Sequence, residues 1–179
     1  MPPDARWWTH ACEGHPHRRL QPHPGRSPCA VDGLGPDELN ARPVEDANSI
    51  AWLVWHLTRV QDDHVADAAS LEQVWLSQGW EKRFGLGLPA RTRGTDTAPG
   101  RSPASRWNRA TCYRLLRRRA RADARVRAGL TAKDFERIVD ERWDPPVSLG
   151  VRLVSVLSDD LQHAGQAAYV RGLLQSAAS

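Results

Sequence analysis

Two acidic residues lie one helical turn before a histidine in SDDLQHAGQ, residues 158–166. Asp159 stands four residues before His163 and Asp160 stands three before it, and on a helix both spacings share one face. A carboxylate and an imidazole one turn apart can bind the same divalent ion, because borderline metals accept mixed oxygen and nitrogen ligands. The same pattern also occurs on ordinary solvated helix faces. The segment is therefore a candidate for half of a metal site.

An earlier segment, DANSIAWLVWHLTRVQDDHVADA, offers two further imidazoles, His56 and His64. A third ligand from a neighbouring helix would leave coordination positions open for water or substrate. His64 lies nearer the middle of the apolar stripe of this segment, and His56 lies at its edge. Hydrophobic periodicity alone does not select His56.

Both segments read as long helices. We expect one over about 48–69, capped by Asn48 or Ser49, because its apolar residues recur at helical spacing without a glycine or proline. We expect the other over about 148–174, capped by Ser148. The stripe of the first helix consists of Ile50, Leu53, Val54, Leu57 and Val60.

Shorter elements are expected around them. Pro36 and the acidic residues after it open a short helix in GPDELNARP. Thr131, with Asp134 three residues on, is placed to cap a helix over 132–143 that the following DPP ends. Residues 75–89 read as a loop with aromatic anchors.

Bulk composition suits one globular domain over 1–179, with 40% hydrophobic and 26% charged residues. No apolar run approaches the roughly 18 residues of a membrane span, and the N-terminus lacks the apolar core of a signal peptide. We therefore expect a cytoplasmic protein. Three cysteines without a CxxC pair argue against a disulfide framework.

Several segments resemble the DinB-like superfamily, in particular its actinobacterial branch related to mycothiol-dependent maleylpyruvate isomerase. They are VDGLGPDELNARP, ANSIAWLVWHLTRVQDDHVAD, GWEKRFGL and DERWDPPVSLGVRLVSVLSDDLQHAGQAAYVRGLL. The resemblance covers about 31–89 and 129–175. It implies an all-α, antiparallel four-helix bundle.

The resemblance also implies a metal site and a chemistry. The ligands would be His56, Asp159 and His163, holding a divalent metal, most often zinc or nickel, with Asp160 as the competing carboxylate. Many members have His where this chain has Asp159, although the isomerase branch also uses a carboxylate. The implied activity is that of a thiol S-transferase or isomerase acting on an electrophilic substrate. Its thiol cosubstrate would be a small molecule such as mycothiol or bacillithiol, and a homodimer is possible.

Other side chains carry weaker signals. Trp143 and Arg152 could line the site, but a core tryptophan and a surface arginine explain them equally well. CEGHPH with His23 and Cys29 offers zinc-type ligands at a spacing that fits no familiar zinc finger.

Two stretches do not fit the bundle. Residues 1–30 are rich in Pro and His, and residues 90–129 are rich in breakers and then in Arg, so both should be irregular or poorly packed. Lys occurs only at Lys82 and Lys133, which indicates GC-rich coding DNA. We hypothesise that 1–30 and 95–128 are translated out of frame.

The Arg-rich run 106–127 supplies an alternative function. Arg pairs with phosphates, so a non-catalytic DinB-like remnant could bind nucleic acid weakly through this run. A solvated charged face is the commoner explanation of such runs, and we do not expect nucleic acid to be a partner.

Overall fold

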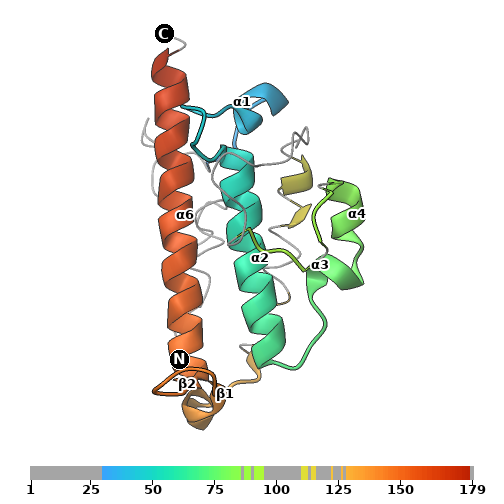
Figure 1. The fold of residues 1–179 in the computed structure, drawn as a ribbon, viewed down its shortest axis with the longest axis vertical. Helices are drawn as coiled ribbons and strands as arrows, with labels where there is room; N and C mark the ends of the chain where they lie inside the picture. Colours follow the sequence, from blue (N-terminus) through green and yellow to red (C-terminus); the bar gives the residue numbers. More distant parts are fainter. Residues whose placement is uncertain are drawn as a thin grey trace, which may run out of the picture.

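Two long antiparallel helices form the frame of the molecule: α2, Ile50–Ala68, and α6, Leu149–Ala177 (Figure 1). The computed structural model describes residues 30–85, 87–89, 91–94, 110–112, 114–115, 122, 126 and 128–177. Helices dominate this part of the chain and the one sheet has two strands, which confirms the all-α prediction.

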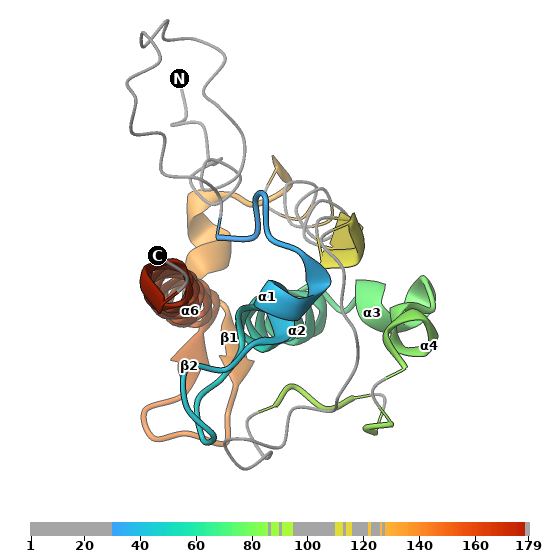
Figure 2. The same ribbon diagram turned by 90° about the horizontal axis from the view of Figure 1, so that it is seen from above.

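The helix α2 is the central element of the described fold. It begins where Ser49 accepts a hydrogen bond from the Trp52 amide at 3.2 Å, so one of the two predicted caps is used. α6 packs on one side of α2, and α3 and α4 lie on the other (Figure 2). As a result α2 is buried around most of its circumference, including polar positions such as Arg59 and Asp62.

The helix α6 presents only one face to the core. Its N-terminus is capped as predicted, with the Ser148 hydroxyl accepting from the Val151 amide at 3.3 Å. Its buried residues recur every three, four or seven positions, which is the pattern of a single helix face. They are Leu149, Val156, Asp160, Ala167 and Val170.

In the described part of the chain, three short α-helices flank the two long ones. α1, Pro36–Asn40, begins at the predicted proline, and the Glu38 carboxylate accepts from the Gly35 amide at 2.7 Å. The segment predicted to be a loop with aromatic anchors forms α3, Val74–Ser77, and α4, Trp80–Phe84. The anchors were correctly identified, since Trp75, Trp80 and Phe84 are buried against α2 in the main core.

The predicted helix over 132–143 is wrong. Thr131 and Asp134 do form the expected capping box, but the turn they open is a 3-10 helix, η2, Ala132–Glu136. The chain then enters β1, Ile138–Asp140, which pairs antiparallel with β2, Val147–Ser148. The β-branched residues of these strands favour the hairpin, and the pairing overrides the local helix signal.

Part of the Arg-rich stretch contributes to the core, contrary to the expected poor packing. The described residues between 110 and 115 are helical, and Cys112 and Leu115 are buried in the main hydrophobic cluster. Residues 1–29, 95–109 and most of 116–127 lie outside the described residues. The predicted irregularity of the N-terminal segment, its zinc-type ligands and the four-helix count therefore remain predictions. None of the described helices combines the length and apolar character needed to span a membrane.

Candidate metal centre

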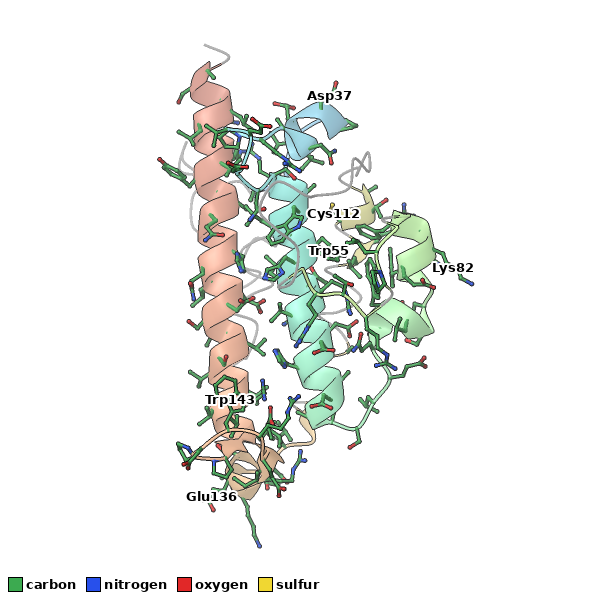
Figure 3. The ribbon with its side chains drawn as sticks, in the orientation of Figure 1. Asp37, Trp55, Lys82, Cys112, Glu136 and Trp143 are labelled. Atoms are coloured by element: carbon green, nitrogen blue, oxygen red, sulfur yellow. The ribbon has the colours of Figure 1, made fainter. Side chains whose placement is uncertain are left out.

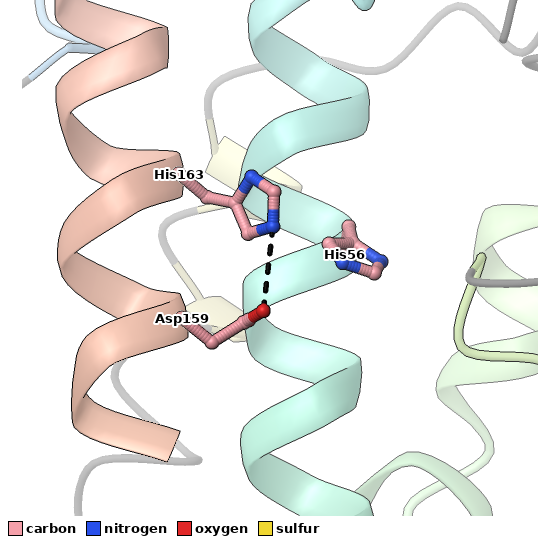
Figure 4. Close-up of side chains that lie close together, drawn as sticks. All are labelled: His56, Asp159 and His163. Atoms are coloured by element: carbon pink, nitrogen blue, oxygen red, sulfur yellow. Dashed lines mark ion pairs between the residues drawn. The ribbon is translucent and has the colours of Figure 1, made fainter. Parts of the chain in front are cut away.

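The side chains of His56, Asp159 and His163 converge between α2 and α6 (Figure 4). α2 supplies His56, while α6 supplies the other two residues from consecutive turns. One ligand atom from each lies within 4.8 Å of the other two. Two ligands bound tetrahedrally to zinc at about 2.0–2.2 Å stand about 3.3–3.6 Å apart, so side-chain movements of about 1 Å would bring all three residues to one ion.

The ring of His56 is enclosed and oriented. It is 5% exposed and stacks on Trp52, with the ring centroids 4.7 Å apart and the planes 11° from parallel. Its Nδ1 lies 2.6 Å from the carbonyl oxygen of Arg93. A carbonyl oxygen can only accept, so Nδ1 carries the proton in the neutral ring and Nε2 keeps a lone pair.

The ring of His163 is oriented from its own helix. Its Nδ1 lies 2.8 Å from Gln166 Oε1, which accepts from it, and its Nε2 lies 3.5 Å from Asp159 Oδ1. The ring meets His56 edge-on, with the centroids 4.6 Å apart. Both imidazoles therefore use Nδ1 for a supporting hydrogen bond, and the Nε2 of His163 faces Asp159.

The two imidazoles differ in their affinity for protons. Burial lowers the pKa of His56 below 6.5. The hydrogen bond to Arg93 opposes this effect by raising the pKa, and the nearby His163 lowers it further. The hydrogen bond to Asp159 raises the pKa of His163 above 6.5, although partial burial opposes it. In the metal-free protein, His163 therefore binds a proton more strongly than His56 does.

This donor set fits a divalent metal ion. Histidines that bind metals usually donate their other ring N–H to a carbonyl, a carboxylate or water, as both His56 and His163 are placed to do. Asp159 Oδ2 is buried and has no hydrogen-bond partner among the described residues. A carboxylate oxygen held in this way is costly unless a cation or a donor satisfies it.

The other sequence candidates lie elsewhere. Asp160, the competing carboxylate, is buried but is not one of the three clustered residues. Nδ1 of His64 is 3.2 Å from Arg152, whose guanidinium also binds Asp140 at 2.6 Å. Trp143 is 65% exposed at the hairpin end of α6 (Figure 3), so it does not contribute a packed wall to the cluster.

Sequence reasoning missed two features beside His56: the carbonyl of Arg93, which accepts from its Nδ1, and Gly94, where the fold leaves no room for a Cβ. Both lie in a segment that reads as a breaker-rich loop. A backbone carbonyl has no residue-type signature, and nothing in the sequence distinguishes this glycine from its neighbours. A separate cavity of about 200 Å³, lined in part by Trp55, Trp75 and Leu88, includes none of the three clustered residues.

The chain is similar to known proteins in sequence and in fold. A family model described as mycothiol-S-transferase matches residues 16–176, a range that runs through the Arg-rich stretch. A solved structure from Enterococcus faecalis, described as a conserved protein of a locus, is similar at a TM-score of 0.76 and 27% identity. The similarity covers 82% of this chain and 87% of that one. No curated protein matches the chain.

Proposed function

The chain belongs to the mycothiol-S-transferase family, within the DinB-like superfamily, and from this membership we propose that it is a metal-dependent thiol transferase. It would form a bond between the sulfur of mycothiol, or of a similar small thiol, and an electrophilic carbon, while the leaving group departs with its bonding electrons and the thiol proton passes to solvent. Zinc or nickel would be held by His56, Asp159 and His163. An isomerase that uses the thiol transiently is the related possibility within the same site.

The convergence of His56, Asp159 and His163 within 4.8 Å is the observation that carries this proposal. The residues come from two helices far apart in the sequence, and the buried Oδ2 of Asp159 has no donor among the described residues. A chance pairing on one helix face explains Asp159 and His163, but it does not explain why His56 meets them across the interface.

Each residue has a defined part in this proposal. Nε2 of His56 and Nε2 of His163 supply lone pairs, and Asp159 supplies a negative charge that offsets part of the charge of the cation. A bound divalent cation with an open position would lower the pKa of a thiol and so provide a thiolate at neutral pH. Three protein ligands leave room for such a thiol.

Cys112 is not a credible nucleophile for this reaction. Its side chain is 1% exposed, and burial raises the pKa of its thiol to about 12. At neutral pH it is therefore protonated and shielded from substrate. This supports a reacting thiol that comes from a cosubstrate and not from the described part of the chain.

The first test compares two histidine variants. His163→Ala should reduce metal affinity on the order of 100-fold or more and abolish conjugation of mycothiol to a fluorogenic haloalkane, because a ligand is lost. His64→Ala is the matched control, since His64 is partly buried on α2 but lies outside the cluster. Elemental analysis and chelator competition give the metal measurement. Equal metal content and activity in both variants would show that the site is wrong.

The second test distinguishes the two neighbouring carboxylates. Asp159→Asn should weaken metal binding strongly, whereas Asp160→Asn should leave it within a few-fold of wild type. The reverse order would transfer the ligand role to Asp160. If wild type and all variants stay metal-free after loading and show no conjugation, the non-catalytic remnant becomes the better account.

A further inference from the structure

We infer that residues Thr92–Gly94 form a strap that fixes both the position and the tautomer of His56. The strap would act by holding the proton on Nδ1 and so keeping Nε2 available for the cation. The consequence for metal affinity rests on the proposed function. The consequence for the ring itself does not, because it concerns the metal-free protein.

Three bonds attach the strap to one face of α2. Thr92 O accepts from Arg59 Nε at 3.3 Å, and Arg93 O accepts from His56 Nδ1 at 2.6 Å. The guanidinium of Arg93 binds Asp63 Oδ2 at 2.8 Å. His56, Arg59 and Asp63 stand at i, i+3 and i+7, so they share a single face of the helix. The strap therefore follows α2 and is not a loop that happens to touch it once.

Gly94 lets the strap approach closely enough to make the bond to His56. Its φ is +93°, a backbone conformation that residues with a Cβ rarely adopt. A Cβ there would stand 2.9 Å from Trp55, 3.0 Å from His56 Nδ1 and 3.0 Å from Trp52. Any larger residue must push the strap away from α2, and the 2.6 Å bond is the contact most directly affected.

The far side of the strap is held by polar groups, of which Gln73 and Arg59 are buried and Asp63 is partly buried. Asp63 accepts from Gln73 through Oδ1 at 2.7 Å while its Oδ2 binds Arg93. Gln73 in turn accepts from Arg59 at 2.8 Å, and Arg59 is 0% exposed. Since every link is directional, the position of Arg93 O is fixed by a closed set of contacts and not by a single ion pair.

The tautomer follows from donor and acceptor chemistry. A neutral imidazole has one N–H, and the Arg93 carbonyl can only accept, so the strap selects the Nδ1–H form. Without that carbonyl, the proton can move to Nε2, the nitrogen that the cation needs. Loss of such an orienting partner typically costs about 10–100-fold in metal affinity.

A pair of glycine variants tests the inference. Gly94→Ala places a Cβ against His56, whereas Gly87→Ala introduces a Cβ at a similar positive φ of +64° with nothing within 4 Å. Ring ¹⁵N NMR of the metal-free protein reports the tautomer of His56, and chelator competition reports metal affinity. We expect Nδ1–H in wild type and Gly87→Ala. Gly94→Ala should show a mixed or Nε2–H ring and about 10–100-fold weaker metal binding.

A milder variant covers the case in which Gly94→Ala does not fold. Asp63→Asn removes the anchor of Arg93, and Asp67→Asn removes an exposed carboxylate one turn further along α2. We expect a smaller shift of the His56 tautomer in the first and none in the second. An unchanged Nδ1–H ring in folded Gly94→Ala, or in Asp63→Asn if Gly94→Ala does not fold, would overturn the inference. If wild type binds no metal, the proposed function fails, and the ring spectra still decide the role of the strap.

Discussion

Replacing Arg59 by alanine is expected to lower the free energy of unfolding by about 3 kcal/mol. Its guanidinium is 0% exposed and binds Asp62 at 3.2 Å, Gln73 at 2.8 Å and Thr92 O at 3.3 Å. Removing one partner of a buried ion pair typically costs about 3–5 kcal/mol. Asp62 keeps two amide donors, Val74 N at 2.9 Å and Trp75 N at 2.7 Å, which places the loss near the lower end of that range.

Arg142→Ala is the matched surface control. Arg142 makes two bonds to Asp140 at 2.9 Å, but its side chain is 85% exposed. Solvent screens such a pair, so its removal should leave the free energy of unfolding close to that of the wild type. Urea unfolding followed by tryptophan fluorescence and circular dichroism measures both variants. A loss of 3 kcal/mol corresponds to a fall in Tm of about 6–12 °C for a chain of this size.

Two results would refute this reasoning. One is a loss below about 1 kcal/mol for Arg59→Ala, and the other is an equal loss in the two variants. Arg59→Lys refines the test, because lysine keeps the charge but cannot reach three acceptors with one planar group. Its loss should fall between those of Arg142→Ala and Arg59→Ala.

Three further predictions concern the site and the thiol. Zinc or nickel at 100 times its Kd should stabilise the wild type by about 2.7 kcal/mol, which corresponds to a rise in Tm of about 5–11 °C. It should not stabilise His163→Ala. An equal rise in Tm for both proteins would show that the metal binds elsewhere. Asp159 raises the pKa of His163 above 6.5. Protonated His163 therefore stabilises the metal-free fold below pH 6.5, and this stabilisation is lost as the pH rises through the raised pKa. Metal affinity should change in the opposite sense and rise with pH over that window, and chelator competition showing a flat profile would contradict it. The pKa of the Cys112 thiol is raised to about 12, so this side chain should resist alkylation at pH ~8 in the folded chain and react in urea. Peptide mass mapping measures both reactions. Rapid alkylation of the folded chain would contradict the burial of Cys112.

The two long helices could be predicted because their signals are local. The expected range 48–69 became Ile50–Ala68, and the expected 148–174 became Leu149–Ala177. Helical apolar spacing and the serine caps are enough for this. The helix over 132–143 failed because its outcome depends on pairing with a strand that lies beyond the DPP turn, which a capping box cannot anticipate.

The pairing of Asp159 with His163 was predictable from spacing, but their meeting with His56 was not. Periodicity favours His64 because it assumes that one face of α2 is apolar and buried. In the fold, α2 is enclosed by α6 on one side and by α3 and α4 on the other, so the edge position of His56 is also an interior one. The resemblance to a family supplied this residue, and the structure supplied the reason why it can occupy that position.

The structural roles of individual arginines could not be predicted from the basic composition. Arg59, Arg93, Arg152 and Arg171 each bind carbonyl or carboxylate oxygens of distant residues. The number of arginines in the sequence, taken alone, suggests a solvated or anion-binding surface. Only the packing shows that these four are used to connect segments.

The order in which the chain is made has a consequence for the proposed metal site. His56 is translated 103 residues before Asp159, and the two meet only when α6 packs on α2. At roughly 5–20 residues per second the ribosome needs about 5–20 s to cover that distance. During this interval His56 lacks its two partners in the cluster. If the proposed site binds a cation, loading would follow release or near-release of the chain, and protein expressed in metal-depleted medium should still take up zinc or nickel after purification.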